Sequence, residues 1–406
     1  MLTIPLERLR AAIALVVAGF GSSAHEAAGG NGGSSSDEAN GSMDELINLA
    51  DFEAAALPRL AAGIRDYYRG GANDELALRE SRAAWDRWQL HYRVLRDVAE
   101  RDLSTEMPGG RIDWPVMIAP TAYHRMAHAD GELATARAAT AMGTAMVLST
   151  LSNTPMEDVA RAARRGLWFQ LYVYKDRGIT RELIARAEAA GCGAIAVTVD
   201  AAVGGQRERD LRNQFAYPPH LPMSNLLPQG PRFARPDLAD GGFMGYVNRM
   251  FDPSLSFRDL EWIAAQTRLP VLVKGVVRPD DAVAALDHGA RGVIVSNHGG
   301  RQLDAAPATA DVLGPVAEAV AGRAPVLVDG GIRRGIDVLR ALALGARAVL
   351  VGRPVLWGLT VGGEAGVRRV LSLLRHEFDV AMALAGARRV TEIDRSLVAR
   401  IGERPR

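Results

Sequence analysis

Cysteine is almost absent from this chain, because Cys192 is the only one among 406 residues. A single cysteine excludes a disulfide within the chain and a metal site built from several thiolates. Cys192 lies just before an apolar segment, so we expect it to be a small buried side chain. Stability must then come from a hydrophobic core, and hydrophobic residues make up 48% of the sequence.

An excess of either charge is also missing. The 48 Lys and Arg residues are offset by 47 Asp and Glu residues, which leaves a net charge of +1 at pH 7. Binding to nucleic acid or to an anionic membrane surface usually needs a basic excess, so the composition argues for neither partner. No apolar run is long enough for a membrane span of about 20 residues, and we expect no stable membrane insertion.

The first 42 residues differ in character from the rest. Arg8, Arg10 and the apolar segment 11–20 resemble a secretory signal. Residues 29–42 are rich in Gly and Ser and have the composition of a flexible linker. We predict that residues 1–42 are a disordered leader or linker and that 43–406 form the folded domain. We expect a cytoplasmic protein, or an exported one if residues 1–27 act as a signal.

What the chain does have is a series of eight short runs rich in Val, Ile and Leu, with helix-forming segments between them. Fully buried parallel strands show such continuous apolar runs, and strands that alternate with helices predict βα units. Eight units close a (β/α)8 TIM barrel, which is the α/β fold we predict. The runs are 115–122, 145–150, 167–173, 194–200, 270–276, 292–297, 325–331 and 348–354.

Two further segments belong to the predicted fold. Residues 44–100 precede the barrel, and helical patterns up to Trp88 predict an N-terminal helical extension. The connection from Ala201 to Ser256, after the fourth strand, is much longer than an ordinary βα loop, and we predict a lid over the site. Helical segments are predicted at 131–143, 179–191, 278–289, 333–345 and 363–386.

Polar residues gather where the apolar runs end. In a barrel of this kind the active site lies at the carboxyl ends of the strands. The seventh run ends in Asp-Gly-Gly at 329–331, followed by Arg333, and the eighth ends in Gly352 and Arg353. Glycines let backbone amides approach an anion, and arginines add charge-assisted donors. Together these two strand ends predict a phosphate site.

His298 and Asp200 follow the sixth and fourth runs, so their side chains can converge over the barrel mouth. A carboxylate beside an imidazole fixes its tautomer and stabilises the imidazolium, which suits a general base near neutral pH. We therefore predict that His298 abstracts a proton with Asp200 as its partner. Side chains able to hold a substrate carboxylate and hydroxyl are Tyr67, Tyr172, Arg207 and Arg301.

Lys274 ends the fifth run inside an apolar segment. A buried amine is costly without a partner, so an anionic ligand or cofactor is predicted beside it. A Schiff-base lysine of a barrel aldolase is the competing interpretation, and it leaves the phosphate site unexplained. His124 and His128 have i, i+4 spacing but no acidic ligand in a metalloprotease pattern, so we predict no metal site.

Taken together, these segments resemble the FMN-dependent 2-hydroxy acid oxidase and dehydrogenase family, which includes glycolate oxidase, lactate oxidase and mandelate dehydrogenase. The resemblance extends from about Leu46 to the C-terminal helix. The motifs that carry it, in order, are DYYRGGANDE (66–75), IAPTA (118–122), FQLYVYKDR (169–177), TVD (198–200), LVKG (272–275), SNHGGRQLD (296–304), VDGGIRRG (328–335) and ALALGARAVLVGRP (341–354).

The resemblance implies FMN as cofactor and oxidation of an (S)-2-hydroxy acid to the 2-oxo acid, with O2 reoxidising the flavin to give H2O2. It implies that His298 is the base, Asp200 its partner, and the two tyrosines and two arginines above the substrate contacts, and it suggests a homotetramer. The residues that it places at FMN are Pro120, Thr121, Ala122, Ser149, Gln170, Thr198, Lys274, Ser296, Asp329, Gly330, Gly331, Arg333, Gly352 and Arg353.

One departure bears on the substrate. Glycolate-specific members of the family resemble Ser-Ser-Trp where this chain has Ser149-Thr150-Leu151. Gly204 and Gly205 follow Asp200 where some relatives carry larger residues. We therefore predict that Leu151 lines a substrate pocket that is roomier than glycolate needs.

Several functions remain as alternatives. A 2-hydroxy acid dehydrogenase or monooxygenase of the lactate or mandelate type is the runner-up, and a flavin-dependent isomerase or a flavin-free aldolase follows. A non-catalytic flavin-binding protein would not need Asp200, His298 and Arg301 together. The sequence leaves open whether the base takes the hydroxyl proton, in a hydride route, or the α-proton, in a carbanion route.

Overall fold

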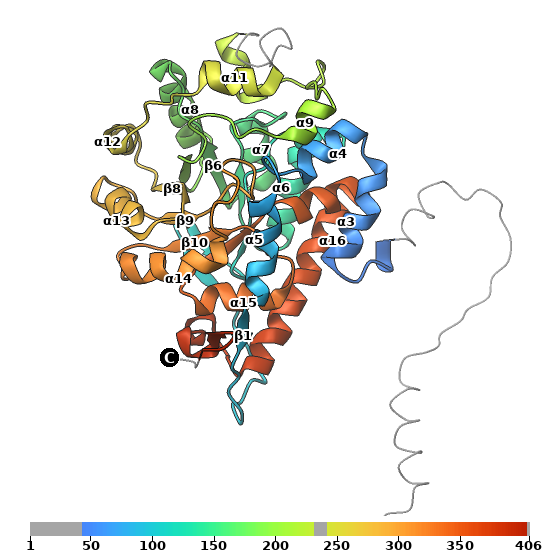
Figure 1. Ribbon diagram of the computed structural model, residues 1–406, viewed down its shortest axis with the longest axis vertical. Coiled ribbons are helices and arrows are strands. Elements are labelled where there is room, and N and C mark those ends of the chain that lie inside the picture. The colour runs from blue at the N-terminus through green and yellow to red at the C-terminus, as the bar shows by residue number, and fades with distance from the viewer. Residues whose placement is uncertain (1–42, 231–241, 404–406) are drawn as a thin grey trace, which may run out of the picture. The chain divides into compact units, whose positions relative to one another are not determined.

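The computed structural model describes residues 43–230 and 242–403. Eight parallel strands close a barrel in the order β10-β11-β4-β5-β6-β7-β8-β9, around which the helices lie (Figure 1). Every predicted run supplies one strand, which confirms the TIM barrel. The strands are β4 (Val116–Ile118), β5 (Met146–Leu148), β6 (Leu167–Leu171), β7 (Ile195–Thr198), β8 (Val271–Val276), β9 (Val293–Val295), β10 (Val326–Asp329) and β11 (Ala348–Val351).

A helix follows each strand, after the long connection in the case of β7. The predicted helical segments coincide with α6, α8, α13 and α15 to within two residues at each end. Each predicted segment extends two residues beyond the end of the helix, to a glycine. Gly345, for example, has a φ of +102° and ends the last of them, as a left-handed stop requires. The outer helices are α6 (Gly131–Ala141), α7 (Met156–Ala163), α8 (Arg177–Ala189), α12 (Phe257–Ala265), α13 (Pro279–Asp287), α14 (Thr309–Val320), α15 (Gly335–Ala343) and α16 (Arg353–Ala385).

Both faces of the barrel wall are apolar, which explains why the strands read as continuous runs. On β4, Val116 and Ile118 pack outward under the helices, while Met117 points into the barrel. Inside, Met117 belongs to a cluster that includes Trp168. The hairpin of β2 (Thr105–Met107) and β3 (Gly110–Ile112) adds Met107 to the same cluster. Because this hairpin directly precedes β4, it covers the amino end of the barrel and leaves the carboxyl end for the site.

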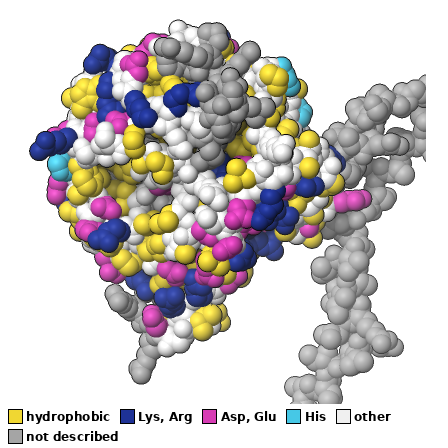
Figure 2. Space-filling view, turned by 45° about the horizontal axis from the view of Figure 1, so that its top comes forward, with side chains coloured by type: hydrophobic (Ala, Val, Ile, Leu, Met, Phe, Trp, Pro, Cys, Tyr) yellow, Lys and Arg dark blue, Asp and Glu magenta, His cyan; other side chains and the backbone are white. Residues whose placement is uncertain are grey.

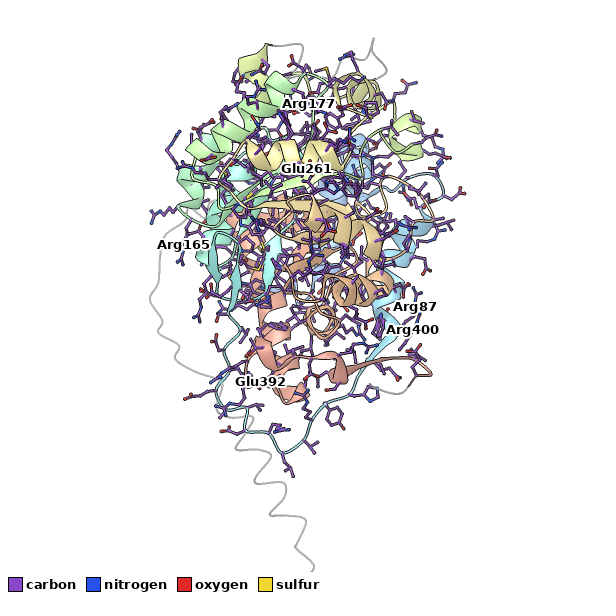
Figure 3. The ribbon with its side chains drawn as sticks, turned by 90° about the vertical axis from the view of Figure 1, so that its left-hand side faces the viewer. Arg87, Arg165, Arg177, Glu261, Glu392 and Arg400 are labelled. Atoms are coloured by element: carbon purple, nitrogen blue, oxygen red, sulfur yellow. The ribbon has the colours of Figure 1, made fainter. Side chains whose placement is uncertain are left out.

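The N-terminal extension is helical but shorter than predicted. It consists of α3 (Leu49–Ala56), the 3-10 turn η1 (Leu57–Arg59), α4 (Ala62–Arg69) and α5 (Leu76–Asp86). Trp88 was expected in the last helix, yet it begins β1 (Trp88–Leu90), which pairs with β12 (Val398–Arg400). A pairing partner more than 300 residues away is invisible in a local helical pattern. Arg87 and Arg400, labelled in Figure 3, both contact Asp311 and fasten this sheet to α14.

The connection from Ala201 to Ser256 contains helices that its Pro- and Gly-rich sequence did not predict. They are α9 (Glu208–Arg212), the 3-10 turn η3 (Ser224–Gln229) and α11 (Gly242–Met250). Figure 1 shows α9 and α11 at one end of the barrel together with α4, opposite to β1. The far end of the connection is held by Arg177, labelled in Figure 3, which binds Asp252 and Asp259 at 2.5 and 2.6 Å.

The last predicted helix, 363–386, is the second part of a longer one. The helix α16 begins at Arg353, immediately after β11, and non-helical angles at Gly362 and Gly363 divide it. A Cβ at Gly363 would lie 2.9 Å from the His128 ring, and its φ is +55°, so the break requires glycine. The first part was not predicted because its apolar sequence continues the strand pattern.

The leader or linker predicted for 1–42 lies outside the described residues, and the domain boundary at Met43 stays a prediction. Within 43–230 and 242–403, none of the helices has both the length and the apolar character needed to cross a bilayer. Cys192 is a buried free thiol, as expected, and burial raises its pKa to about 12.

Candidate active site

A cavity lies at the carboxyl ends of the barrel strands. This is where the active site of a TIM barrel is found. Its walls come from the barrel, from α4 and from the connection after β7. All sequence-predicted site residues line it except Asp200 and Ser296. Acidic and basic side chains are interspersed over the neighbouring surface (Figure 2), so an anion would be held by individual buried groups within the cavity.

The predicted catalytic pair is in place. His298 lies at the cavity wall, and its Nδ1 is 2.7 Å from Asp200 Oδ1. Asp200 stands behind the ring, packed against β8, where a Cβ at Gly275 would come within 2.6 Å of its Cγ. His298 has a φ of +57°, a conformation that costs about 1–3 kcal/mol in a non-glycine residue and is typical of functional sites.

The electrostatics favour a neutral imidazole. Burial lowers the pKa of His298, and the charge of Asp200 only partly offsets this. Burial alone would raise the pKa of Asp200, but the charge and hydrogen bond of His298 and the charge of Lys274 outweigh it, so that pKa lies below its usual value. Near neutral pH Asp200 is therefore ionised and accepts from Nδ1–H, which leaves Nε2 as the basic atom.

Lys274 faces a carboxylate of its own chain. Its Nζ is 3.1 Å from Asp329 Oδ2 and donates to Ser296 Oγ at 2.9 Å. Burial lowers the pKa of Lys274, but Asp329 and Asp200 outweigh it and the net pKa is raised, so the amine stays charged. The argument that Lys274 requires an anionic ligand was therefore wrong, because the sequence does not reveal Asp329 as its partner. Ser296 also accepts from the backbone of His298, so it positions two residues rather than lining the cavity.

The four residues predicted to hold a substrate converge on His298. The Tyr172 hydroxyl is 3.5 Å from His298 Nε2. The guanidiniums of Arg301 and Arg207 lie 4.9 and 5.9 Å from the centre of the Tyr67 ring. Burial lowers the pKa of Arg207 to about 10, with a further contribution from the charge of Arg301. Arg207 is buried, Arg301 is partly buried, and two cations against one ring favour an anionic ligand beside them.

The predicted phosphate cradle is also assembled. Arg353 donates to the carbonyls of Tyr68, Gly70 and Gly299 at 2.9–3.0 Å. Arg333 donates to its neighbour's carbonyl, and neither guanidinium has a carboxylate within 4.0 Å among the described residues. Burial lowers the pKa of Arg353 to about 9, helped by the charges of Arg301 and Arg333. An anion is the group that this cluster lacks.

Two details of the cradle fit FMN specifically. Asp329 Oδ1 is buried with no hydrogen-bond partner in the described part of the chain, so it is available to accept from a hydroxyl such as those of a ribityl chain. Gly331, with a φ of +77°, approaches α5 so closely that a Cβ would lie 1.7 Å from the Ser81 carbonyl. Only glycine fits at this position. Its small size lets residues 329–331 lie close to α5 and form part of the cavity wall.

Of the residues named for a roomy substrate pocket, one lines the cavity and two do not. Leu151 lines the cavity, and its backbone is held by Ser149 Oγ at 3.1 Å and by the Tyr123 amide at 3.2 Å. Gly204 and Gly205 do not line it. A Cβ at Gly205 would lie 2.4 Å from the Arg301 carbonyl, so this glycine serves close backbone packing and leaves no room for substrate.

Sequence reasoning missed several residues. Tyr68, Gly299 and Leu356 line the cavity, and their positions next to predicted residues were the available signal. Phe215 and Phe251 were not foreseen. Both belong to the connection after β7, and they stack on Tyr67 and Tyr172 with ring centres 4.8 and 4.5 Å apart. These two contacts join the connection after β7 to tyrosines of the cavity wall, which supports the predicted lid.

The two histidines set aside as metal ligands do not share a site. His124 is buried, and its ring contacts the hydroxyls of Thr121 and Thr135. The Nδ1 of His128 accepts from the backbone of Asp130. In the residues that the structure describes, no three His, Cys, Asp or Glu side chains are grouped to hold a metal ion.

Comparison with known proteins gives one consistent result. The family described as FMN-dependent dehydrogenase matches residues 56–400. The chain is 49% identical to 2-hydroxyacid oxidase 1 of Homo sapiens, over 88% of this chain and 97% of that protein, and 48% identical to L-lactate oxidase of a Nostoc species, over 87% and 98%. A crystal structure of mandelate oxidase with (S)-4-hydroxymandelic acid superposes with a TM-score of 0.81 at 43% identity, covering 86% of this chain and 97% of that one. The chain therefore belongs to the FMN-dependent dehydrogenase family.

Proposed function

We propose that this protein is an FMN-dependent (S)-2-hydroxy acid oxidase whose reduced flavin is reoxidised by O2 with formation of H2O2. The observation that carries the proposal is the neutral His298, held by Asp200, at the wall of a cavity that is also lined by Arg207, Arg301, Arg333 and Arg353. The names of the relatives, 2-hydroxyacid oxidase, L-lactate oxidase and mandelate oxidase, support the same reaction.

The substrate's carboxylate is the group that the buried cations select. Arg207 and Arg301 both face the Tyr67 ring and supply guanidinium donors to the same part of the cavity. Guanidinium matches a carboxylate in a bidentate geometry, which fixes the orientation of a small substrate. Tyr172 then donates its hydroxyl near His298 Nε2, where the 2-hydroxyl of the substrate is expected.

His298 performs the proton transfer. Its Nε2 takes one proton from the substrate, either from the hydroxyl or from the α-carbon, and Asp200 stabilises the imidazolium that results. FMN, when bound, supplies the two-electron acceptor that makes the oxidation possible. Lys274, charged and buried at the cavity wall beside Asp329, would help to hold FMN and would stabilise negative charge on the reduced cofactor. Phe215 and Phe251 stack on Tyr67 and Tyr172 and so help to fix the two tyrosine rings.

The test begins with the purified protein reconstituted with FMN. Anaerobic addition of an (S)-2-hydroxy acid should bleach the flavin absorbance, and air should restore it with one H2O2 formed per 2-oxo acid. A flavin that stays oxidised with every 2-hydroxy acid would contradict the proposal. Slow reoxidation by O2 with fast reoxidation by a quinone would identify a dehydrogenase, and release of CO2 would identify a monooxygenase.

The phosphate assignment has its own test. Replacing Arg333 by Met should weaken FMN binding about 10- to 150-fold, because a hydrogen bond to a charged group contributes about 1.5–3 kcal/mol. Riboflavin, which has no phosphate, should bind wild type and variant equally, as titration by flavin fluorescence would show.

The adjacent arginine offers a matched control. Arg334 is half-exposed and pairs with Glu377 at 2.8 Å, away from the cavity. Arg334→Met should leave the affinity for FMN unchanged. Equal losses in both variants, or a parallel loss of riboflavin affinity in Arg333→Met, would show that Arg333 serves folding and not the phosphate.

Three finer expectations remain proposals: that O2 is the physiological electron acceptor, that the protein assembles as a homotetramer, and that it works in the cytoplasm. Size-exclusion chromatography with light scattering and cell fractionation would address the last two. Shortening the chain to begin at Met43 should leave activity and FMN content unchanged, because no described site residue precedes Tyr67.

A further inference from the structure

A buried hydrogen-bond relay leads from the cavity into the outer helix layer. Thr121, at the cavity wall, has its Oγ1 2.6 Å from Nε2 of His124, in the 3-10 turn η2 (His124–Met126). On the other side of the ring, Nδ1 is 3.0 Å from Oγ1 of Thr135 in α6. His124 and Thr135 are fully buried. One imidazole therefore joins a cavity-lining hydroxyl to a hydroxyl outside the barrel.

The direction of these hydrogen bonds follows from counting protons. Thr135 donates its only hydroxyl hydrogen to the Gly131 carbonyl, one turn earlier in α6, at 3.3 Å. With that hydrogen engaged, its oxygen can accept from His124, and on this ground we assign the ring proton to Nδ1. In a neutral imidazole the other nitrogen is an acceptor, so Thr121 donates to Nε2. The hydrogen of Thr121 is turned away from the cavity, and its oxygen offers only lone pairs to a ligand.

The surroundings of His124 keep the imidazole neutral. Burial lowers its pKa, and the charge of Glu132 and a hydrogen bond to the Thr121 backbone offset this only in part. Glu132 is itself engaged elsewhere. Its Oε1 accepts from the backbone amides of His124 and Asn153, and its Oε2 accepts from the Thr154 hydroxyl. Both carboxylate oxygens of Glu132 are thus occupied by groups other than the imidazole ring, so the carboxylate does not compete for the relay.

We propose that His124 is a positioning residue for the cofactor, which acts by holding the Thr121 hydroxyl as a pure hydrogen-bond acceptor. Two-electron reduction of an isoalloxazine adds at least one ring N–H. An acceptor at the cavity wall favours a ligand with more donors, so Thr121 binds reduced FMN more tightly than oxidised FMN. This raises the midpoint potential of the bound flavin and makes substrate oxidation more favourable. The inference rests on the proposed function, because it requires FMN in this cavity.

The decisive variant changes a residue that does not touch the cavity. Thr135→Val keeps the shape of the side chain and removes the acceptor for Nδ1–H. The ring can then take its other tautomer, donate from Nε2 to Thr121, and turn the Thr121 hydrogen into the cavity. The ratio of affinities for reduced and oxidised FMN should fall about tenfold, which for a two-electron couple is about 30 mV in midpoint potential.

The same helix provides a matched control. Thr140 also donates to the carbonyl one turn earlier, that of Ala136, at 3.2 Å, and it donates to the Ala163 carbonyl at 2.5 Å, so its hydroxyl is engaged away from His124. Thr140→Val should leave the potential unchanged. His124→Phe should lower it by as much as Thr135→Val, and the double variant should be no lower than either single one, since both act through Thr121.

Spectroelectrochemical titration of the FMN-loaded variants gives the potentials, and 15N NMR of histidine-labelled protein reports the tautomer of His124. Protonation at Nδ1 in wild type, with its loss in Thr135→Val, is the expected result. Equal potentials in wild type and Thr135→Val would overturn the inference while leaving the proposed function intact. An equal shift in Thr140→Val would overturn it too. A wild type that fails to bind FMN, or whose flavin no hydroxy acid reduces, refutes the proposed function instead.

Discussion

Replacing His298 by Ala should slow substrate reduction of the flavin by about 100- to 10,000-fold, the range typical of losing a general base. FMN should remain bound, because the phosphate cradle of Arg333 and Arg353 is built by other strands. Anaerobic stopped-flow absorbance measures the reduction rate, and the flavin content of the purified variant gives the control. A variant that is reduced at the wild-type rate would remove His298 from the mechanism.

The pH dependence should carry the signature of the same residue. His298 is active when neutral, and burial places its pKa below the ordinary value of 6.5. The reduction rate should therefore be constant near neutral pH and fall only as the pH drops through this lowered pKa, where the base becomes protonated. A limb that begins above pH 6.5 would contradict a buried neutral imidazole.

Asp200→Asn separates two roles of the carboxylate. It removes a charge that raises the pKa of His298, so the acid limb should move to lower pH. The maximal rate should fall as well, because the imidazolium loses its stabilising partner and the amide no longer fixes the tautomer. A lower rate with an unmoved limb would indicate a purely structural role.

The parts of the fold that local pattern determines were predictable. All eight barrel strands were found because burial on both faces makes each strand a continuous apolar run, and a helix follows every strand. The errors lie where a distant partner decides. Trp88 leaves the helical pattern to pair with β12, and the connection after β7 folds into α9 and α11 because it packs against the site.

The site shows the same division. Residues at strand ends were placed correctly, since the barrel brings every strand's carboxyl end to one mouth. What failed were statements about which residue faces which. The partner of Lys274 is Asp329, on another strand, and Gly205 faces the Arg301 backbone rather than substrate. His124 was considered only as a metal ligand, because only the three-dimensional structure shows its ring between two threonines.

Leu151 is the remaining candidate for the determinant of substrate size. Its side chain lines the cavity, while hydrogen bonds at its amide and carbonyl hold the backbone, so a substitution there changes the volume of the pocket without moving the wall. Because Gly205 does not line the cavity, the prediction of a roomy pocket rests on Leu151 and on Phe215 and Phe251, which stack on the cavity tyrosines. We therefore expect the wild type to prefer 2-hydroxy acids larger than glycolate.

Leu151→Trp should reverse that preference, because an indole would occupy the space that a larger substrate side chain needs. An apolar group in such a pocket is worth about 1–3 kcal/mol, so the ratio of kcat/KM for larger acids over glycolate should fall about 10- to 200-fold. The comparison uses glycolate, (S)-lactate, (S)-2-hydroxyoctanoate and (S)-mandelate. Leu151→Met, which nearly conserves volume, is the matched control and should keep the wild-type order. If the wild type favours glycolate, or if the Trp variant keeps its order, then Leu151 does not set the size of the pocket.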